Sequence, residues 1–322
     1  METEMALKQK RAGLPWRALA SPLLFVAMIV IFTVLRPGYL TAISIKSVLV
    51  QTSFLGIISI GLTLVMMTGG VDMSNGYAAG LGAIGGMWFV VNNHMSIGMG
   101  LLIAVWLVLL IGTINGLCVS RLGVAPFVAT LGTMFLGMGL QNWLDEGGQQ
   151  ISYGLPEAYV FLGQGSVGIV PMPVLIFLII FVIFFFITEL TPVGRYLRGS
   201  GLNQFTSRLS GVKVSFYVFI SYVLSSLLAG VLGYILGASQ KYISSGLGNT
   251  YQMDSLLTVL LGKTLTNGKI TVWSTAFGAL FLCAFQNGLS MLGMPVTTLA
   301  ISKGLLLIAL LLFSRYRKKQ ES

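Results

Sequence analysis

The chain has 322 residues, of which 55% are hydrophobic and only 9% are charged, and its mean hydropathy is +0.89. Soluble globular domains carry about 25% charged residues, so this composition excludes a soluble enzyme, a disordered protein and a nucleic-acid-binding domain. The formal net charge of +10 does not restore the last class, because Lys and Arg cluster at both ends of the chain and in one central loop rather than in a single patch.

Ten apolar segments predict membrane-spanning helices, because crossing a bilayer takes roughly 20 mostly apolar residues. In chain order, the predicted spans are 19–35, 48–68, 76–91, 97–119, 124–143, 172–189, 214–237, 254–265, 272–292 and 298–313. The third and the eighth are short, which leaves open whether they are discontinuous. Backbone polar groups inside a bilayer must be satisfied within each segment, and helices achieve this. The sequence thus predicts an all-α, polytopic membrane protein with about ten transmembrane helices.

The basic residues predict an orientation. When the amino terminus is placed in the cytoplasm and ten spans are threaded, only Arg36, Lys46 and Lys241 fall outside, and Lys303 lies within the last span. Cytoplasmic loops carry the excess of Lys and Arg in membrane proteins. Both termini are therefore expected in the cytoplasm.

The segments between the spans are too short to form a separate soluble domain. We expect one membrane domain over residues 1–322. Its parts outside the membrane would be cytoplasmic tails at 1–18 and 314–322, a cytoplasmic loop at 190–213 and an acidic external loop at 145–171.

One short pattern occurs twice. Asn115-Gly116-Leu117, followed by Pro126, is echoed by Asn287-Gly288-Leu289, followed by Pro295. In the predicted topology the first copy lies at an inner end and the second at an outer end, which is the sign of an inverted repeat. Asn-Gly near a proline also recurs by chance, so the repeat stays one of two interpretations.

Asp72 is the most informative single residue, because it lies between two apolar segments with almost no polar loop around it. An acid near membrane depth is expensive and needs a partner. Asp72 or Ser74 is expected to cap the following helix, and a direct role in transport is the alternative. Capping is also the expectation for Asp254, and Lys303 is expected either to snorkel or to pair with an acid.

Motifs of soluble enzymes fail on their context. Residues 80–85 and 163–168 both fit G-x-G-x-x-G, but neither lies in a βαβ unit, and residues 262–264 resemble only the end of a phosphate-binding loop. Cys118 and Cys283 lie in apolar runs, and His94 is the one histidine. We therefore expect no catalytic residues, no metal site, no cofactor and no ATP binding by this chain itself.

The central cytoplasmic loop carries its own helix signals. Asn203 suits an N-cap, and Gly211 suits the left-handed residue after a helix end. Phe205, Leu209 and Val212 share one face of a helix. A short amphipathic helix at this place either docks into a groove of a partner or lies on lipid headgroups, and the residues alone leave both interpretations open.

Three segments together resemble the permeases of ABC transporters of the ribose, xylose, galactose and autoinducer-2 type. They are Gly69-Gly70-Val71-Asp72-Met73-Ser74, then Gly194-Arg195 with Asn203 and Arg208-Leu209-Ser210-Gly211-Val212, and finally Asn115-Gly116 with Pro126-Phe127-Val128-Ala129-Thr130-Leu131. The resemblance covers nearly the whole chain. The sequence departs from the family pattern at 199–204 and at 262–269.

The resemblance implies a non-enzymatic membrane subunit of an ATP-driven importer in the bacterial inner membrane. Its partners would be a separate ABC ATPase, a second permease subunit, identical or different, and a periplasmic or lipid-anchored binding protein that delivers a sugar; no nucleic acid is expected. The implied ATPase contact is Gly194, Arg195, Asn203, Phe205, Arg208, Leu209 and Gly211. Candidates for the translocation path are Asp72, Ser74, Asn115 and Asn287.

Other transport classes remain as alternatives. An ion-coupled secondary transporter needs an intramembrane acid, histidine or lysine relay, and only Asp72, Asp254 and Lys303 would supply it. Within the ABC architecture, a branched-chain amino-acid or nucleoside permease is the other alternative. No nucleophile–base pair or metal cluster supports a membrane-embedded enzyme.

Overall fold

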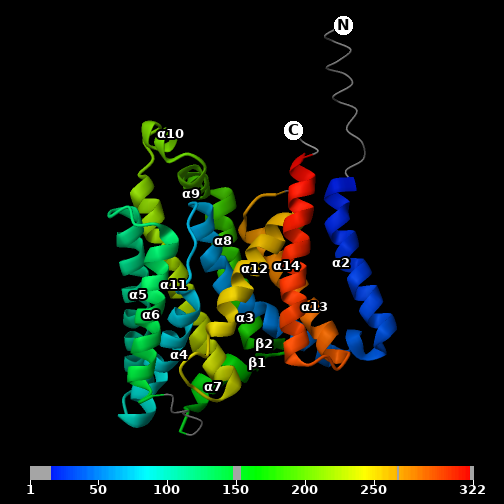
Figure 1. Cartoon of the computed structure of the whole chain (residues 1–322). Coiled ribbons are helices and arrows are strands. Elements are labelled where there is room, and N and C mark those ends of the chain that lie inside the picture. Colours follow the sequence, from blue (N-terminus) through cyan, green and yellow to red (C-terminus); the bar gives the residue numbers. More distant parts are fainter. Residues whose placement is uncertain (1–15, 148–153, 267, 320–322) are drawn as a thin grey trace.

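The structure, a computed structural model, describes residues 16–147, 154–266 and 268–319 (Figure 1). Of the expected cytoplasmic tails, residues 1–15 and 320–322 therefore lie outside the described part. The elements run α2 (Trp16–Leu35), the 3-10 helix η1 (Pro37–Leu40), α3 (Ala42–Met67), α4 (Asn75–Asn92), α5 (Ile97–Ser120), α6 (Pro126–Leu144), α7 (Glu157–Gln164), β1 (Ser166–Val167), β2 (Val170–Pro171), α8 (Met172–Phe185), the π-helical turn η2 (Phe186–Leu190), α9 (Pro192–Leu202), α10 (Gln204–Leu209), α11 (Val214–Gln240), α12 (Asn249–Leu265), α13 (Val272–Met291) and α14 (Val296–Lys319).

Each of the ten predicted spans falls on a helix. Among the described residues, five helices are long and apolar enough to cross a membrane: Ala42–Met67, Ile97–Ser120, Met172–Leu190, Val214–Gln240 and Val272–Met291. Pro22–Leu35 and Val296–Ala309 are shorter apolar helices. The chain is thus a helical, multi-pass membrane protein, and the number of ten crossings stays a prediction.

The two short predicted spans are both unbroken helices. The irregular backbone lies in front of each, at 68–74 before α4 and at 241–248 before α12. Gly69 ends α3 with a φ of 83°, a left-handed conformation that glycine adopts without a Cβ clash. Because α12 begins at Asn249, it is longer than the 254–265 expected from the apolar run.

A small sheet departs from the expected all-α fold. Strands β1 and β2 pair antiparallel, with Ser166 opposite Pro171 and Val167 opposite Val170. Gly168 takes a φ of 60° in the turn between them. The hairpin follows α7 in the expected external loop, at the end of the bundle opposite α9 and α10 (Figure 1). Two-residue strands leave almost no alternating pattern in the sequence to predict them.

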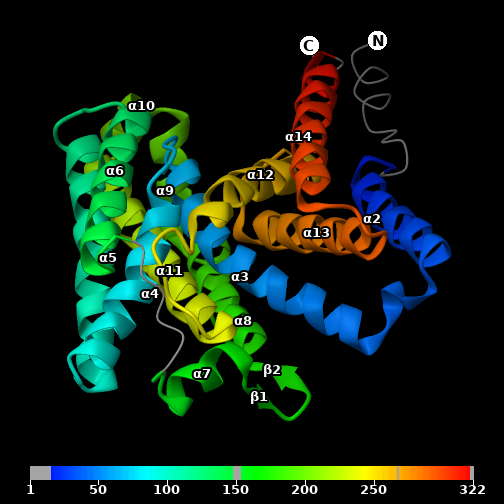
Figure 2. The ribbon, with the colours of Figure 1, turned by 60° about the horizontal axis from the view of Figure 1, so that its bottom comes forward.

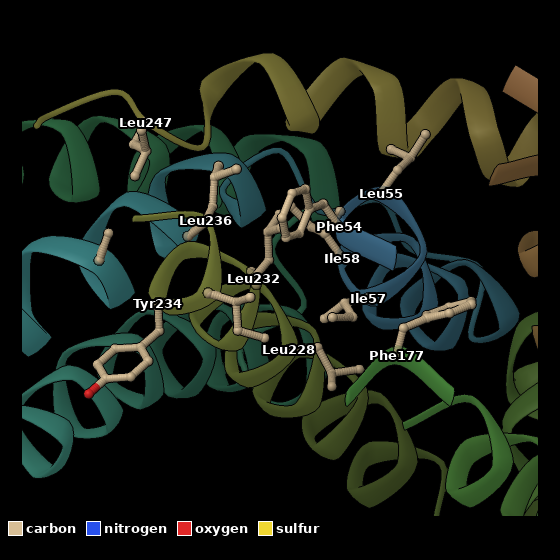
Figure 3. Close-up of a cluster of buried hydrophobic side chains, with 14 of the residues drawn as sticks. Phe54, Leu55, Ile57, Ile58, Phe177, Leu228, Leu232, Tyr234, Leu236 and Leu247 are labelled. Atoms are coloured by element: carbon tan, nitrogen blue, oxygen red, sulfur yellow. The ribbon is translucent and has the colours of Figure 1, made fainter. Parts of the chain in front are cut away.

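Helix α11 lies at the centre of the bundle and packs against α3, α4 and α5. Leu228, Leu232 and Leu236 of α11 belong to the same buried cluster as Phe54, Ile57 and Ile58 of α3, shown in Figure 3. The helices approach closely because their contact surfaces carry glycine. A Cβ on Gly233 of α11 would collide with the carbonyl of Ala79 in α4.

Large apolar side chains also cover the outside of the bundle. Trp106 of α5, Ile179 and Val182 of α8, and Ile301 and Leu305 of α14 are all exposed. Scattered apolar residues are normal on a soluble protein, but belts of them on several helices mark contact with lipid or with other membrane helices. This surface agrees with the low charge content of the chain.

Helices α3–α6 and α11–α14 have matching neighbours. Helix α4 packs against α5 and α6, as α12 packs against α13 and α14. Between the two sets, α11 packs against α4 and α5, as α3 packs against α12 and α13. The two echoed motifs also fold alike, because Gly123 after α5 and Gly293 after α13 are both left-handed, with φ values of 68° and 77°.

Candidate functional site

Asp72 is buried between α3 and α4, with only 2% of its surface exposed. One carboxylate oxygen accepts hydrogen bonds from the backbone N–H and the hydroxyl of Ser74, at 2.9 and 2.6 Å. The other oxygen accepts from the hydroxyl of Ser225 in α11 at 2.8 Å. No Lys or Arg in the described part of the chain lies within ion-pair distance of it. Hydroxyl and amide donors therefore replace the water that burial removes.

A line of hydrogen bonds continues from Ser74 to two further helices. Asn115 of α5 donates from Nδ2 to the Ser74 hydroxyl at 2.8 Å, and Thr133 of α6 donates to Oδ1 of Asn115 at 2.6 Å. All donors in this line point toward Asp72, and such chains polarise one another. The network joins α5, α6 and α11 to the irregular segment 68–74.

Three of the four predicted path residues, Asp72, Ser74 and Asn115, thus come together. Asn287 lies apart from them: its Nδ2 donates to the hydroxyl of Ser44 at 2.8 Å and ties α13 to α3. Of the two residues expected to cap α4, Asp72 accepts the backbone N–H of Ser74 at the helix start, whereas Ser74 does not act as a side-chain cap. Ser74 occupies the N-cap position of α4 without a side-chain cap hydrogen bond, because its hydroxyl is already engaged by Asp72 and Asn115.

A largely polar cavity of about 470 Å³ lies between α3, α12, α13 and α14. It is lined by Gln51, Leu55, Gln240, Tyr242, Ser244, Ser245, Gly246, Leu247, Thr250, Tyr251, Asp254, Cys283, Gln286 and Lys303. Figure 2 shows α3, α12 and α13 running side by side, with α14 across the end of α12. We call this space the polar cavity.

An ion pair lies in the wall of the polar cavity. Nζ of Lys303 in α14 is 2.8 and 2.6 Å from the two carboxylate oxygens of Asp254 in α12. The expectation that Asp254 caps α12 is wrong, because α12 begins at Asn249 and Asp254 lies within it. The expectation that Lys303 pairs with an acid is confirmed, and Asp254 is the partner. The paired charges leave the cavity wall without net charge.

A loop closes one side of the polar cavity and is itself held from behind by α6. Oδ2 of Asp145 accepts a hydrogen bond from the backbone N–H of Ser245, and Oε1 of Gln141 accepts one from Gly246, both at 2.8 Å. Nε2 of Gln141 also donates to the carbonyl of Tyr77 at 2.7 Å. The loop 241–248 is therefore a fixed wall rather than a loose cover.

At the far end of the bundle, α9 and α10 form what we call the docking segment, residues 192–211. Asn203 caps α10 by accepting a hydrogen bond from the N–H of Thr206 at 3.0 Å, and Gly211 follows the helix with a φ of 80°. Both predictions are confirmed. Leu202, Phe205 and Leu209 are 88%, 73% and 75% exposed. They form an apolar knob with no cover among the described residues.

The predicted face of this helix differs at one residue. Val212 is half-buried against the cluster of Val65, Val218 and Tyr222 rather than exposed beside Phe205. The backbone turns at Gly211 after α10, so helical spacing no longer holds there. Arg208 stays exposed, as does Arg195 in α9.

Arg198 anchors the docking segment, and its role was not predicted. Its guanidinium is 2.9 Å from a carboxylate oxygen of Glu189 and donates to the carbonyl of Thr188 at 2.8 Å. Gly194 lies against the same turn, where a Cβ would collide with the Thr188 carbonyl. Gly194 therefore permits close packing of α9 on η2 and is buried.

The docking segment also touches the irregular segment that holds Asp72. A Cβ on Gly201, near the end of α9, would collide with the carbonyl of Met67 and approach the backbone N of Gly69 within 2.8 Å. Backbone meets backbone here without side chains between them. The docking segment and the Asp72 network are therefore separated by only a few residues of chain.

Sequence reasoning missed the polar cavity as a site. Its residues come from α3, the end of α11, the loop after it, α12, α13 and α14, and no local motif links them. One signal was present: Gln51 and Gln286 are amides inside apolar spans. Polar residues at membrane depth usually face a cavity or the bundle interior, so these two side chains indicated one.

Comparisons with known proteins agree on one family. The family described as "Branched-chain amino acid transport system / permease component" matches residues 44–313. The ribose import permease protein RbsC of Bacillus subtilis is 30% identical over 289 residues, covering 89% of each chain. RbsC of Escherichia coli K12 is 32% identical over 300 residues, covering 92% of each chain. The galactofuranose transporter permease protein YtfT of the same strain is 30% identical over 270 residues, covering 81% of this chain and 76% of YtfT. No solved structure matches the chain.

The multi-pass helical bundle, with its polar cavity and its exposed apolar knob, thus matches membrane transport proteins over most of its length. The chain belongs to the permease family of these relatives, as the match over most of its length shows. It is the permease, the membrane component, of such a transport system.

Proposed function

We propose that the chain is the membrane-spanning permease subunit of an ATP-driven, binding-protein-dependent importer for a sugar or a sugar-like molecule in the bacterial inner membrane. The relatives named for ribose and galactofuranose support the substrate class. The observation that carries the proposal is the docking segment, whose exposed Leu202, Phe205 and Leu209 offer an apolar knob to a partner groove.

A separate ATPase subunit would bind this apolar knob. Beside it lies a hollow of about 240 Å³ whose lining includes Arg121 of the α5–α6 turn and Arg208 of α10. Two guanidinium groups at one hollow suit an acidic side chain of a partner. The ATPase contact would then combine apolar insertion with charge, as the proposed residues Gly194, Arg195, Asn203, Phe205, Arg208, Leu209 and Gly211 imply. Gly194 and Gly211 would contribute by shaping the backbone of the docking segment, since they have no side chain.

A second permease subunit and a binding protein complete the proposed importer. Helix α14 leaves Val296, Ile301 and Leu305 exposed, and α6 leaves Phe135 and Trp143 exposed. These faces suit either lipid or a second permease, identical or different. The binding protein would deliver its sugar at the end that carries α7 and the hairpin.

The proposed orientation places both termini and the docking segment in the cytoplasm. It is supported by the position of the start of α2, the end of α14 and α9–α10 at one end of the bundle (Figure 1). The matching neighbours of α3–α6 and α11–α14 support the proposal that these units are an inverted repeat. Asp72, Ser74 and Asn115 would then brace the path rather than contact the substrate directly.

The test is a charge reversal in the docking segment. We expect Arg208→Glu to release the ATPase during purification and to abolish ATP-dependent uptake, while the permease stays inserted in the membrane. Lys46→Glu is the matched control, since Lys46 is also exposed but lies near the start of α3, far along the chain from the docking segment. Retention of the ATPase by Arg208→Glu would refute the docking assignment. Uptake that survives ATP depletion and collapses with the ion gradient would instead favour a secondary transporter.

A further inference from the structure

The polar cavity has the size of a small-molecule site. Its volume of about 470 Å³ falls within the roughly 300–1,000 Å³ that ligand pockets occupy. In the proposed orientation it lies in the outer half of the membrane, because Gln51 is in the outer half of α3 and Lys303 is near the outer start of α14. A substrate released at the outer face would reach it first.

The lining selects for hydroxyl groups. Gln51, Gln240 and Gln286 supply amides. Hydroxyls come from Ser244, Ser245 and Thr250. Tyr242 and Tyr251 add aromatic rings with polar tips. Leu55 and Leu247 are the only aliphatic side chains in the described lining. The polar share of the lining is the larger one, which favours a hydroxylated ligand over a branched-chain amino acid.

The charge balance selects for a neutral ligand. Lys303 and Asp254 neutralise each other at 2.6 Å, and no other charged side chain lines the described cavity. An anion or a free cation would have to break this ion pair to be bound. A ligand that carries only hydroxyl groups can donate to the carboxylate and accept from the ammonium without breaking it.

One hydrogen-bond donor in the wall of the polar cavity, the amide of Gln286, is unsatisfied in the described part of the chain. Nε2 of Gln286 is buried and has no hydrogen-bond partner among the residues that the structure describes. A buried donor without a partner destabilises the protein unless something else satisfies it. Gln286 lies on α13 in the same wall as Cys283, so a rotation of its amide toward the cavity would let a bound hydroxyl oxygen satisfy this donor.

We propose that the polar cavity is a binding site for one neutral, polyhydroxylated small molecule, a monosaccharide, within each permease chain. The site makes the permease itself selective, in addition to any selection by a binding protein. This inference rests on the proposed function and names the place in the chain where the sugar is recognised. Asp254, Lys303 and Gln286 are its central residues.

The test is equilibrium binding of radiolabelled sugars to the purified permease–ATPase complex without a binding protein. The probes are D-ribose, D-galactose, D-fructose and D-xylose, with L-leucine as the comparison. We expect saturable binding of at least one sugar, one molecule per permease chain, and none of leucine. Gln286→Leu, of similar size but without the amide, should weaken binding by at least tenfold. Ser290→Ala, on the same helix but exposed and outside the cavity lining, should bind as the parent does.

A second measurement guards against a variant that fails to fold. In a Cys118→Ser background, Cys283 is the one thiol left, and it faces the cavity. The bound sugar should slow its alkylation, and Gln286→Leu should remove this protection. Absence of saturable binding for all four sugars, or equal binding by Gln286→Leu, would overturn the cavity proposal. ATP-dependent uptake that persists alongside that result would leave the proposed function standing, whereas loss of uptake and of the ATPase in the parent protein would refute the function separately.

Discussion

Asp72 and Asp254 are both acids at membrane depth, but the structure satisfies them in opposite ways. Asp72 is almost fully buried and accepts three hydrogen bonds from serines, with no basic partner among the described residues. Asp254 faces a polar cavity and is paired with Lys303. Asp72 therefore stabilises the fold, whereas the pairing of Asp254 with Lys303 keeps the polar cavity electrically neutral. Substitution of Asp72 should therefore lower the stability of the protein most, and substitution of Asp254 should change which ligand the polar cavity binds.

The largest expected effect is that of Asp72→Ala. It leaves the N–H of Ser74 and the hydroxyl of Ser225 without their acceptor, and unsatisfied buried groups that had bound a charged partner cost about 1–3 kcal/mol each or more. We expect the free energy of unfolding to fall by about 3–5 kcal/mol, because several buried donors lose their acceptor together. The measurement is denaturation of the purified permease in detergent micelles.

Asp72→Asn is the matched control for this variant. Its side-chain oxygen still accepts from Ser74, and the Ser225 hydroxyl can turn to accept from its amide, so we expect less than half of the loss. If Asp72→Ala unfolds as the parent protein does, Asp72 does not brace segment 68–74. The distinction from Asp254 then disappears.

The second effect concerns the Asp254–Lys303 pair. Lys303→Met leaves an unpaired carboxylate in the cavity wall, and we expect a loss of about 2–3 kcal/mol of unfolding free energy. The double variant Asp254→Asn with Lys303→Met removes both charges and should recover to within about 1 kcal/mol of the parent, and Asp254→Asn alone is the other single variant. A double-mutant cycle on thermal unfolding isolates the interaction between the two groups. Additive losses in the cycle would contradict the ion pair.

The smallest effect separates two neighbouring hydroxyls on α6. Thr133→Val removes the donor to Asn115, which leaves Oδ1 of Asn115 buried and unsatisfied, and should cost about 1–2 kcal/mol. Thr130→Val should cost less than about 1 kcal/mol, because the Thr130 hydroxyl bonds only to carbonyls of its own helix. Chemical denaturation of the two variants side by side makes the comparison. Equal losses would show that the hydrogen-bond line toward Asp72 carries no extra energy.

Local signals predicted local structure well. Asn203 and Gly211 mark the two ends of α10 as expected. A helix cap and a glycine in the left-handed conformation depend on only a few adjacent residues. The apolar runs located a helix at every predicted span for the same reason. The family resemblance supplied the class of transporter, which composition and spacing did not reach.

The errors came from contacts between distant segments. Asp254 was expected to cap a helix because its nearest polar neighbours precede it in sequence, yet its partner Lys303 lies 49 residues further on. Asn115 was named as a path residue by its type, and that role stays a prediction; its hydrogen bonds to Ser74 and Thr133, outside its own helix, were not foreseen. The polar cavity needs the packing of five helices and a loop before its lining residues become neighbours. Burial of a polar group at a given place is set by tertiary packing, which pattern alone does not encode.

Gly201 and Gly69 meet without a side chain to cushion them. Side chains elsewhere can absorb a small shift by changing rotamer, but closely packed backbones have no such slack. A push on α9 must therefore either move the end of α3 by a similar amount or separate the two. The contact between Gly201 and Gly69 therefore couples the docking segment directly to segment 68–74, which carries Asp72.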